Sequence, residues 1–317
     1  MSALIINANA LNIPLADRSV QCVVTSPPYY GLRNYGVDGQ LGLEPTPDEY
    51  VANMVAVFRE CKRVLKDDGT LWLNIGDSYA SMKSRYNQKA QNLNGGKAQD
   101  NEFQGNKTDL YHHPELGLKD KDLIGIPWMV AFALRADGWY LRQDIIWAKP
   151  NPMPESVKDR CTKSHEYIFL LTKSARYYFD ADAVREENSE TSHTGGTYRN
   201  EWKYAQIKNT DKSAMAVGIP IPRNGRNKRS VWTVTTKPYK GAHYATFPPE
   251  LITPCILAGA PEGGIVFDPF VGSGTTVATA VKLGRRGVGL DLSMKYLREN
   301  ARERIYQEEM QPVLCTR

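Results

Sequence analysis

Apolar positions along the chain follow two alternating patterns. Short runs rich in branched aliphatic residues are followed by segments in which apolar residues recur every three or four positions. The first pattern is typical of buried strands and the second of amphipathic helices. The predicted strands are 4–6, 23–25, 70–75, 139–147, 166–172, 264–267 and 287–291, and the predicted helices are 47–65, 122–136 and 275–283. Strands that alternate with helices predict an α/β fold with a doubly wound, mostly parallel sheet.

The helix that follows residue 46 has recognisable boundary signals. Thr46 with Glu49 three positions later is the pattern of a capping box, and Pro47 suits the first helical position. The turn-forming sequence Asp67-Asp68-Gly69 is expected to end this helix before the next strand begins at Thr70.

The loop after the strand 23–25 carries the first candidate chemistry, Ser26-Pro27-Pro28-Tyr29. Two prolines cannot donate to a sheet ladder, so the chain leaves the sheet at a strand's carboxyl end, where open α/β sheets bind ligands. The Ser26 hydroxyl and a following backbone carbonyl can accept hydrogen bonds there, and Tyr29 offers a ring that can stack on a base. Taken alone, these four residues fit better a loop that ends a strand with a packed tyrosine.

A second candidate site follows the strand 264–267. The turn Gly272-Ser273-Gly274 leads into a helix and lets a ligand approach the backbone closely. It has no Walker lysine, which disfavours a phosphate-binding loop. Asp268, just before the turn, suits a cationic amino-acid group, and Asp291 ends the next strand at the position of an acid that binds ribose hydroxyls.

Composition divides the 317-residue chain into regular and irregular segments. Residues 81–121 are rich in Asn, Gln, Lys and Gly and predict a flexible insertion, so the expected parts are 1–184, 185–240 and 241–317. Five dispersed cysteines predict reduced thiols in a cytoplasmic protein without a disulfide framework. His112-His113 lacks acidic or thiol partners at ligand spacing, so no metal site is expected. No apolar run is long enough to predict a membrane span.

Positive charge is concentrated in the middle part. Residues 199–240 contain ten Lys or Arg against two acidic residues, a net charge of +8 in a chain of net charge +5. With the aromatic residues between them, these cations predict a nucleic-acid contact, although a solvated charged face has the same composition. The candidate DNA-binding residues are Arg223, Arg226, Lys228 and Arg229 here, with Arg33 and Lys149 near the first loop.

Both motifs resemble those of the DNA amino-methyltransferases. Ser26-Pro27-Pro28-Tyr29 is similar to their catalytic motif, and the stretch from Asp268 to Thr275 is similar to their S-adenosylmethionine motif. The order of the two, with a basic segment between them, resembles the β class, which implies a circularly permuted, Rossmann-like fold with an inserted DNA-recognition region. The cofactor-binding residues that the resemblance implies are Asn9, Ala10, Phe247, Asp268, Pro269, Phe270, Gly272, Ser273, Gly274, Thr275, Thr276 and Asp291.

The resemblance implies methyl transfer to the exocyclic amine of a base flipped out of double-stranded DNA. Ser26 and Pro27 would hold the amine, while Pro28 and Tyr29 would enclose the base. Serine at the first motif position favours N4 of cytosine over N6 of adenine. Two other interpretations are a protein glutamine methyltransferase, which the basic segment argues against, and a DNA-binding module without catalysis. A homodimer and a cognate restriction endonuclease are partners that the resemblance leaves open.

Overall fold

The computed structural model describes residues 2–80, 117–187, 225–236 and 247–309. These residues fall into two compact units, one formed by Met1–Phe179 with Ser230–Arg317 and the other by Asp180–Arg229. Most of the expected insertion at 81–121, the pair His112-His113 and Arg223 lie outside the described residues.

The larger unit is built on an eight-stranded sheet in the order β1-β8-β7-β2-β3-β5-β4-β6. The strands are β1 Ala3–Asn7, β2 Val20–Thr25, β3 Leu65–Ile75, β4 Tyr140–Ala148, β5 His165–Thr172, β6 Val231–Thr233, β7 Ile265–Asp268 and β8 Arg286–Asp291. Among these strands β5 alone runs antiparallel to its neighbours, and every other pairing is parallel. The predicted mostly parallel sheet is therefore confirmed.

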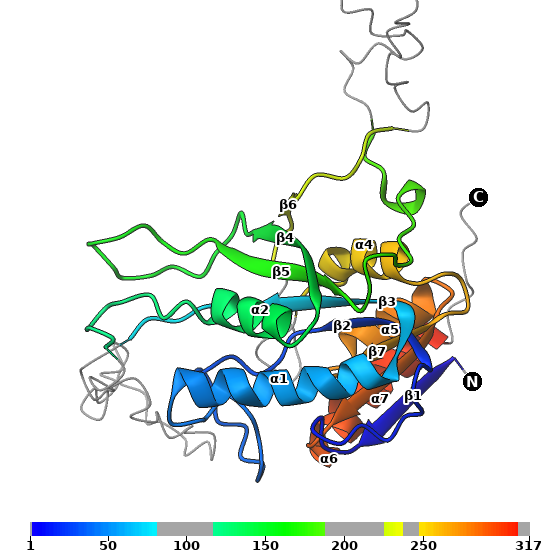
Figure 1. Cartoon of the computed structure of the whole chain (residues 1–317), viewed down its shortest axis with the longest axis horizontal. Coiled ribbons are helices and arrows are strands. Elements are labelled where there is room, and N and C mark those ends of the chain that lie inside the picture. Colours follow the sequence, from blue (N-terminus) through cyan, green and yellow to red (C-terminus); the bar gives the residue numbers. More distant parts are fainter. Residues whose placement is uncertain (1, 81–116, 188–224, 237–246, 310–317) are drawn as a thin grey trace, which may run out of the picture. The chain divides into compact units, whose positions relative to one another are not determined.

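Helices cover both faces of this sheet (Figure 1). The helices are α1 Pro47–Val64, α2 Ile126–Ala136, α4 Pro249–Gly259, α5 Thr275–Lys282, α6 Met294–Tyr296 and α7 Arg302–Glu309, with a π-helical turn η4 at Leu297–Ala301. Helices α1 and α2 pack against each other on one face, whereas α4 contacts β2, β3 and α5 on the other. This arrangement is the doubly wound α/β fold that the alternating pattern predicts.

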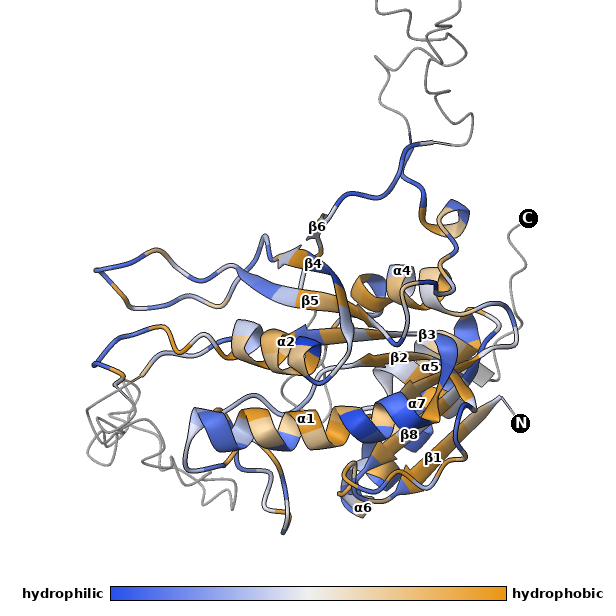
Figure 2. Cartoon of the chain, in the orientation of Figure 1, coloured by the Kyte–Doolittle hydropathy of each residue, from blue (hydrophilic) through white to orange (hydrophobic). Residues whose placement is uncertain are grey.

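The alternation of side chains along the strands supplies a core on each face. In β2, Val23 joins the apolar cluster formed with α1 and α2, while Cys22 and Val24 are buried outside that cluster. On the face towards α4, Gly259 lies so close to the sheet that a Cβ would come within 2.7 Å of Cys22 Sγ. Figure 2 shows apolar colouring along the central strands and a mixture of polar and apolar residues along α1.

Helix α1 begins as its sequence predicts but ends differently. The Thr46 hydroxyl accepts a hydrogen bond from the backbone N–H of Glu49 at 3.2 Å, so the predicted cap is confirmed. The helix ends at Val64, and β3 begins directly at Leu65, so Asp67 and Asp68 belong to the strand. Leu65 already has extended backbone angles, and the Lys173 ammonium donates to its carbonyl at 2.9 Å.

Two other boundaries differ from the sequence prediction. Helix α2 begins at Ile126 and not at 122, because Gly125 before it has a φ of +87°, in the left-handed region, and Asp77 caps its amino end. Strand β6 pairs with β4 through Trp147 and Trp232, so residues 231–233 belong to the sheet although the recognition region was expected to extend to residue 240.

Candidate active site

The two sequence motifs line one cavity of about 900 Å³ at a single edge of the sheet. Strands β2, β7 and β8 end at this edge, and the antiparallel β5 begins there. Of the predicted residues, the lining includes Asn9, Ala10, Ser26, Pro27, Pro28, Tyr29, Arg33, Lys149, Phe247, Asp268, Pro269, Phe270, Gly272, Ser273, Thr275 and Asp291. The cavity volume lies in the range that encloses a ligand of cofactor size.

Asp268 ties the catalytic strand to the cofactor turn. Its two carboxylate oxygens accept hydrogen bonds of 2.6 Å from the hydroxyls of Thr25 and Thr276, and one of them also accepts from the N–H of Phe270 at 3.0 Å. Burial raises the pKa of Asp268 to about 6, while the hydroxyl donors act in the opposite direction. Thr276 therefore lies behind the cavity wall as a support for this carboxylate.

The glycine turn is held by Asp291 at the end of β8. One Asp291 oxygen accepts from the N–H of Gly272 at 3.0 Å, and the other accepts from the N–H of Ser293 at 2.8 Å. Gly274 has a φ of +81°, and a Cβ there would meet the backbone of Ala301 at 3.0 Å, so glycine is required. The turn is thus held by Asp291 on one side and packed against Ala301 on the other.

The side chains at the opposite wall are positioned by neighbouring strands. The Pro28 carbonyl accepts a 2.8 Å hydrogen bond from the buried Tyr50 hydroxyl, which fixes the proline loop. The Tyr29 ring lies against Gly76, where a Cβ would come within 2.6 Å of Tyr29 Cε2. Burial raises the pKa of Tyr29 well above its usual value, and the nearby Glu166 carboxylate raises it further.

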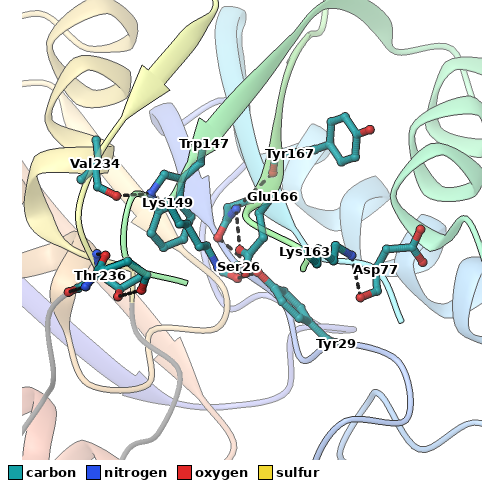
Figure 3. A network of polar contacts seen from close by, with 12 residues as sticks. Ser26, Tyr29, Asp77, Trp147, Lys149, Lys163, Glu166, Tyr167, Val234 and Thr236 are labelled. Carbon is teal, nitrogen blue, oxygen red and sulfur yellow. Dashed lines mark hydrogen bonds and ion pairs between the residues drawn. The ribbon is translucent and has the colours of Figure 1, made fainter. Parts of the chain in front are cut away.

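A polar network joins Ser26 to residues that the sequence motifs do not contain (Figure 3). The Tyr29 hydroxyl lies 3.4 Å from Ser26 Oγ, 3.3 Å from Asn74 Oδ1 and 2.7 Å from Glu166 Oε2. Glu166 also forms an ion pair with Lys149, whose ammonium lies 4.2 Å from the centre of the Trp147 ring. Sequence reasoning missed Asn74 and Glu166. The available signal was a polar residue directly after the apolar run 71–73 and another directly before the apolar run 167–171.

The wall above the network comes from the segments that follow β4 and β6. Trp147 Nε1 donates to the carbonyl of Val234 at 2.8 Å, and the Asn151 amide exchanges two hydrogen bonds with the backbone of Thr236, at 2.9 and 3.1 Å (Figure 3). The Asn151 amide therefore joins the segment after β4 to the segment after β6.

The predicted DNA-binding residues separate into two groups. Arg33 and Lys149 line the cavity, and Lys149 is paired with Glu166. In the smaller unit, Glu186 accepts from Arg226 Nε at 3.2 Å and from Arg229 Nε at 2.9 Å, and Lys228 lies 4.0 Å away. These three predicted DNA-binding side chains therefore converge on one carboxylate, whereas Arg185 of the same unit pairs with Asp182.

The cavity wall fits the adenosine and methionine parts of S-adenosylmethionine. Asn9 accepts from the N–H of Leu11 at 2.9 Å, so its side chain caps a turn while it lines the cavity. Ala10 and Phe247 provide buried apolar surface on the same wall. Asp291 and the fixed glycine turn would hold the ribose and the amino-acid end, because carboxylates and backbone N–H groups are the partners that such groups need.

Two further properties concern the residues that the structure describes. Within 2–80, 117–187, 225–236 and 247–309, no three His, Cys, Asp or Glu side chains gather where they could ligate a metal ion. No helix in these ranges combines the length and the apolar composition needed to cross a bilayer.

Comparison with known proteins identifies the family. A model of the family described as DNA methylase matches residues 20–302. The Type II methyltransferase M.Cfr9I of Citrobacter freundii is 47% identical over 283 residues, which cover 89% of this chain and 80% of that protein.

Solved structures show the same fold. The PvuII DNA methyltransferase (cytosine-N4-specific) has a TM-score of 0.59 at 16% identity, covering 98% of this chain and 92% of the other. A putative DNA modification methylase from Thermus thermophilus, complexed with S-adenosyl-L-methionine, has a TM-score of 0.58 at 20% identity, covering 98% and 96%. The chain belongs to the N6/N4 DNA methylase family of S-adenosylmethionine-dependent methyltransferases.

Proposed function

We propose that the protein methylates N4 of cytosine at a specific sequence in double-stranded DNA. The observation that carries the proposal is the position of Ser26, the first residue of the Ser-Pro-Pro-Tyr motif, in the cavity that also contains the glycine turn and Asp291. Serine at this motif position is more typical of cytosine-N4 enzymes, and the PvuII enzyme, which has a similar fold, is named cytosine-N4-specific.

The chemistry that this cavity must perform is the activation of a poor nucleophile. An exocyclic amine of a base is unreactive because its lone pair is delocalised into the ring. Ser26 Oγ and the Pro27 carbonyl would accept hydrogen bonds from the two amine hydrogens and draw the nitrogen towards tetrahedral geometry. This arrangement returns the lone pair to nitrogen, and most of the rate enhancement comes from positioning and electrostatics.

S-adenosylmethionine, when bound, supplies the methyl group on a positively charged sulfonium. The protein's own contribution is to hold that donor in line with the amine. Asp291 and the backbone of Gly272 are already joined by a 3.0 Å hydrogen bond, so the two elements that would grip the donor are preorganised. Asp268 fixes their distance from the proline loop through Thr25, the residue just before Ser26.

The base reaches this cavity only after it leaves the duplex. The Tyr29 ring packs against Gly76, and its hydroxyl donates a hydrogen bond to Glu166. Held in this position, the ring would stack on the flipped base. Base stacking on an aromatic ring contributes about 1–3 kcal/mol. The proposal extends to a Type II restriction–modification setting, because M.Cfr9I is named a Type II methyltransferase; methylated DNA is then expected to resist the endonuclease that shares the target.

Mass spectrometry of nucleosides from treated DNA tests the proposal. The purified protein is incubated with S-adenosylmethionine and unmethylated genomic DNA, which is then digested to nucleosides. We expect N4-methylcytosine to accumulate in the reaction and to be absent when the Ser26→Ala variant replaces the wild type. Accumulation of N6-methyladenine without N4-methylcytosine would contradict the choice of base.

A further inference from the structure

Three polar groups form a continuous chain from the methyl-accepting position to a carboxylate. The Ser26 hydroxyl donates to Tyr29 Oη at 3.4 Å, and the Tyr29 hydroxyl donates to Glu166 Oε2 at 2.7 Å (Figure 3). In this direction both hydrogens point towards Glu166, which leaves a lone pair of Ser26 Oγ available to the base. A chain of this polarity can pass a proton from the base to the carboxylate.

The reaction requires such an outlet. An amine that gains a methyl group carries one hydrogen too many, and that hydrogen must leave as a proton. A positioned acceptor for it typically contributes about 10²- to 10⁴-fold in rate. The structure must therefore provide a base within hydrogen-bond reach of the amine or of a group that relays the proton.

Other carboxylates of the cavity are engaged differently. Both oxygens of Asp268 accept from the hydroxyls of Thr25 and Thr276, which do not line the cavity. Both oxygens of Asp291 accept from backbone N–H groups. Asp77 caps α2 by accepting from the N–H groups of Gly125 and Ile126. Among these cavity carboxylates, Glu166 is the one that a hydroxyl chain connects to Ser26.

The Glu166 carboxylate is surrounded by cations and by an amide donor. The Lys149 ammonium pairs with Glu166 Oε1, and the Asn74 amide donates to Oε2 at 3.3 Å. A second cation, Lys163, stands near the same carboxylate and donates to the carbonyl of Asp77 at 2.8 Å. Glu166 and Lys149 are 16% and 17% exposed, so released protons have a path to solvent.

We propose that Glu166 is the terminal acceptor of the proton that leaves the methylated amine, reached through Ser26 Oγ and Tyr29 Oη. The carbon–nitrogen bond forms as the carbon–sulfur bond breaks, and the electron pair of the latter stays on sulfur. The amine proton moves to Ser26 as the serine proton moves to Tyr29 and the tyrosine proton moves to Glu166. The inference rests on the proposed amine methylation and applies to either base.

The high pKa of Tyr29 agrees with this route. Because burial and the Glu166 carboxylate hold that pKa well above its usual value, the tyrosine stays protonated at neutral pH. The Tyr29 hydroxyl therefore accepts the proton from Ser26 and donates its own proton to Glu166 in one step. A purely structural role of Glu166, holding the Tyr29 ring in place, would need only a hydrogen-bond acceptor at the same position.

Single-turnover methylation by Glu166→Gln and Tyr29→Phe separates the two roles. The glutamine amide oxygen still accepts from Tyr29 but is not basic, and phenylalanine keeps the ring but removes the relaying hydroxyl. We expect each variant to lose about 100-fold in rate with unchanged S-adenosylmethionine affinity, and the double variant to lose no more than either one. The control is Glu60→Gln, which makes the same change at a carboxylate that pairs with Arg63 on α1, outside the cavity lining.

The dependence of the rate on pH provides the second readout. Because the relay ends on a carboxylate that an amide cannot replace as a proton acceptor, Glu166→Gln is expected to change the pH profile of the rate relative to the wild type. Wild-type rates and an unchanged pH profile for Glu166→Gln, or a full rate for Tyr29→Phe, would overturn the relay. Failure of the proposed function is distinguishable, since it would appear as an absence of N4-methylcytosine in the wild-type reaction itself.

Discussion

Thr25 Oγ1 donates a 2.6 Å hydrogen bond to Asp268 Oδ1 and so joins two residues that are 243 positions apart in the chain. Thr25 ends β2 and precedes Ser26, while Asp268 ends β7 and precedes the glycine turn. Both are buried, at 0% and 2% exposure. This contact sets the distance between the part of the site that activates the amine and the part that holds the methyl donor.

Replacement of Asp268 by asparagine tests the cost of burying this carboxylate. The folded-state pKa of about 6 lies above the ordinary value of 3.8, so the folded protein holds a proton that the unfolded chain releases between these values. The stability that this bound proton contributes is fully present below about pH 4. As the pH rises through 6, the free energy of unfolding falls by about 2–3 kcal/mol. The free energy of unfolding of Asp268→Asn, relative to the wild type, should therefore rise between pH 4 and 6 in urea titrations. A constant difference would contradict the burial effect.

Asp291→Ala should weaken cofactor binding through two losses. The ribose hydroxyls would lose an acceptor, and Gly272 would lose the 3.0 Å hydrogen bond that fixes the turn. We expect the Kd for S-adenosylmethionine to rise at least ~10-fold, or about 1.4 kcal/mol, in isothermal titration calorimetry. The control is Asp17→Ala, which removes an exposed partner of Arg63 at the carboxyl end of α1. This variant should bind S-adenosylmethionine normally. An unchanged affinity for Asp291→Ala would refute its role at the ribose.

Gly76→Ala should impair turnover by moving Tyr29. The added Cβ would lie 2.6 Å from Tyr29 Cε2, so the ring must shift out of the stacking position. We expect a loss of at least ~10-fold in methylation rate with normal S-adenosylmethionine affinity. On a Tyr29→Ala background, which should itself be inactive while still binding the cofactor, Gly76→Ala should change neither stability nor binding further. A fully active Gly76→Ala variant would show that the position of the ring is not required.

Arg226 and Arg229 should contribute to DNA affinity through phosphates. Both guanidinium groups lie against Glu186, at 3.2 and 2.9 Å, and phosphate oxygens would compete with this carboxylate. The double variant Arg226→Gln, Arg229→Gln should bind duplex DNA more weakly, and the slope of log K against log salt should fall by about 2. Glu186→Gln should change affinity in the opposite direction. Arg59→Gln, on α1, should leave the salt slope as in the wild type; equal slopes in all variants would contradict phosphate contact.

The elements and the meeting of the two motifs could be predicted from the sequence because they depend on local signals. Branched aliphatic runs specify strands, and Pro27-Pro28 and the glycine turn specify where strands stop. Parallel strands place their carboxyl ends at one edge, so Ser26 and Asp268 were expected together, and the shared cavity confirms this.

The contacts within the site depend on tertiary geometry that no local pattern specifies. Glu166 reaches Tyr29 only because β5 runs antiparallel and begins at the edge where β2 ends. The direction of a strand cannot be read from its own residues. For the same reason the sequence did not predict that Lys149 pairs with Glu166, or that the Asp268 oxygens accept hydrogen bonds from Thr25 and Thr276.

Transfer of a labelled methyl group to DNA by Ser26→Ala is the most direct test of the site. The same preparation is used to measure S-adenosylmethionine affinity by calorimetry, so that chemistry and cofactor binding are separated. We predict that transfer falls at least ~100-fold while the Kd stays within twofold of the wild type, because Ser26 acts on the amine and not on the donor. Transfer by Ser26→Ala at the wild-type rate would contradict the account.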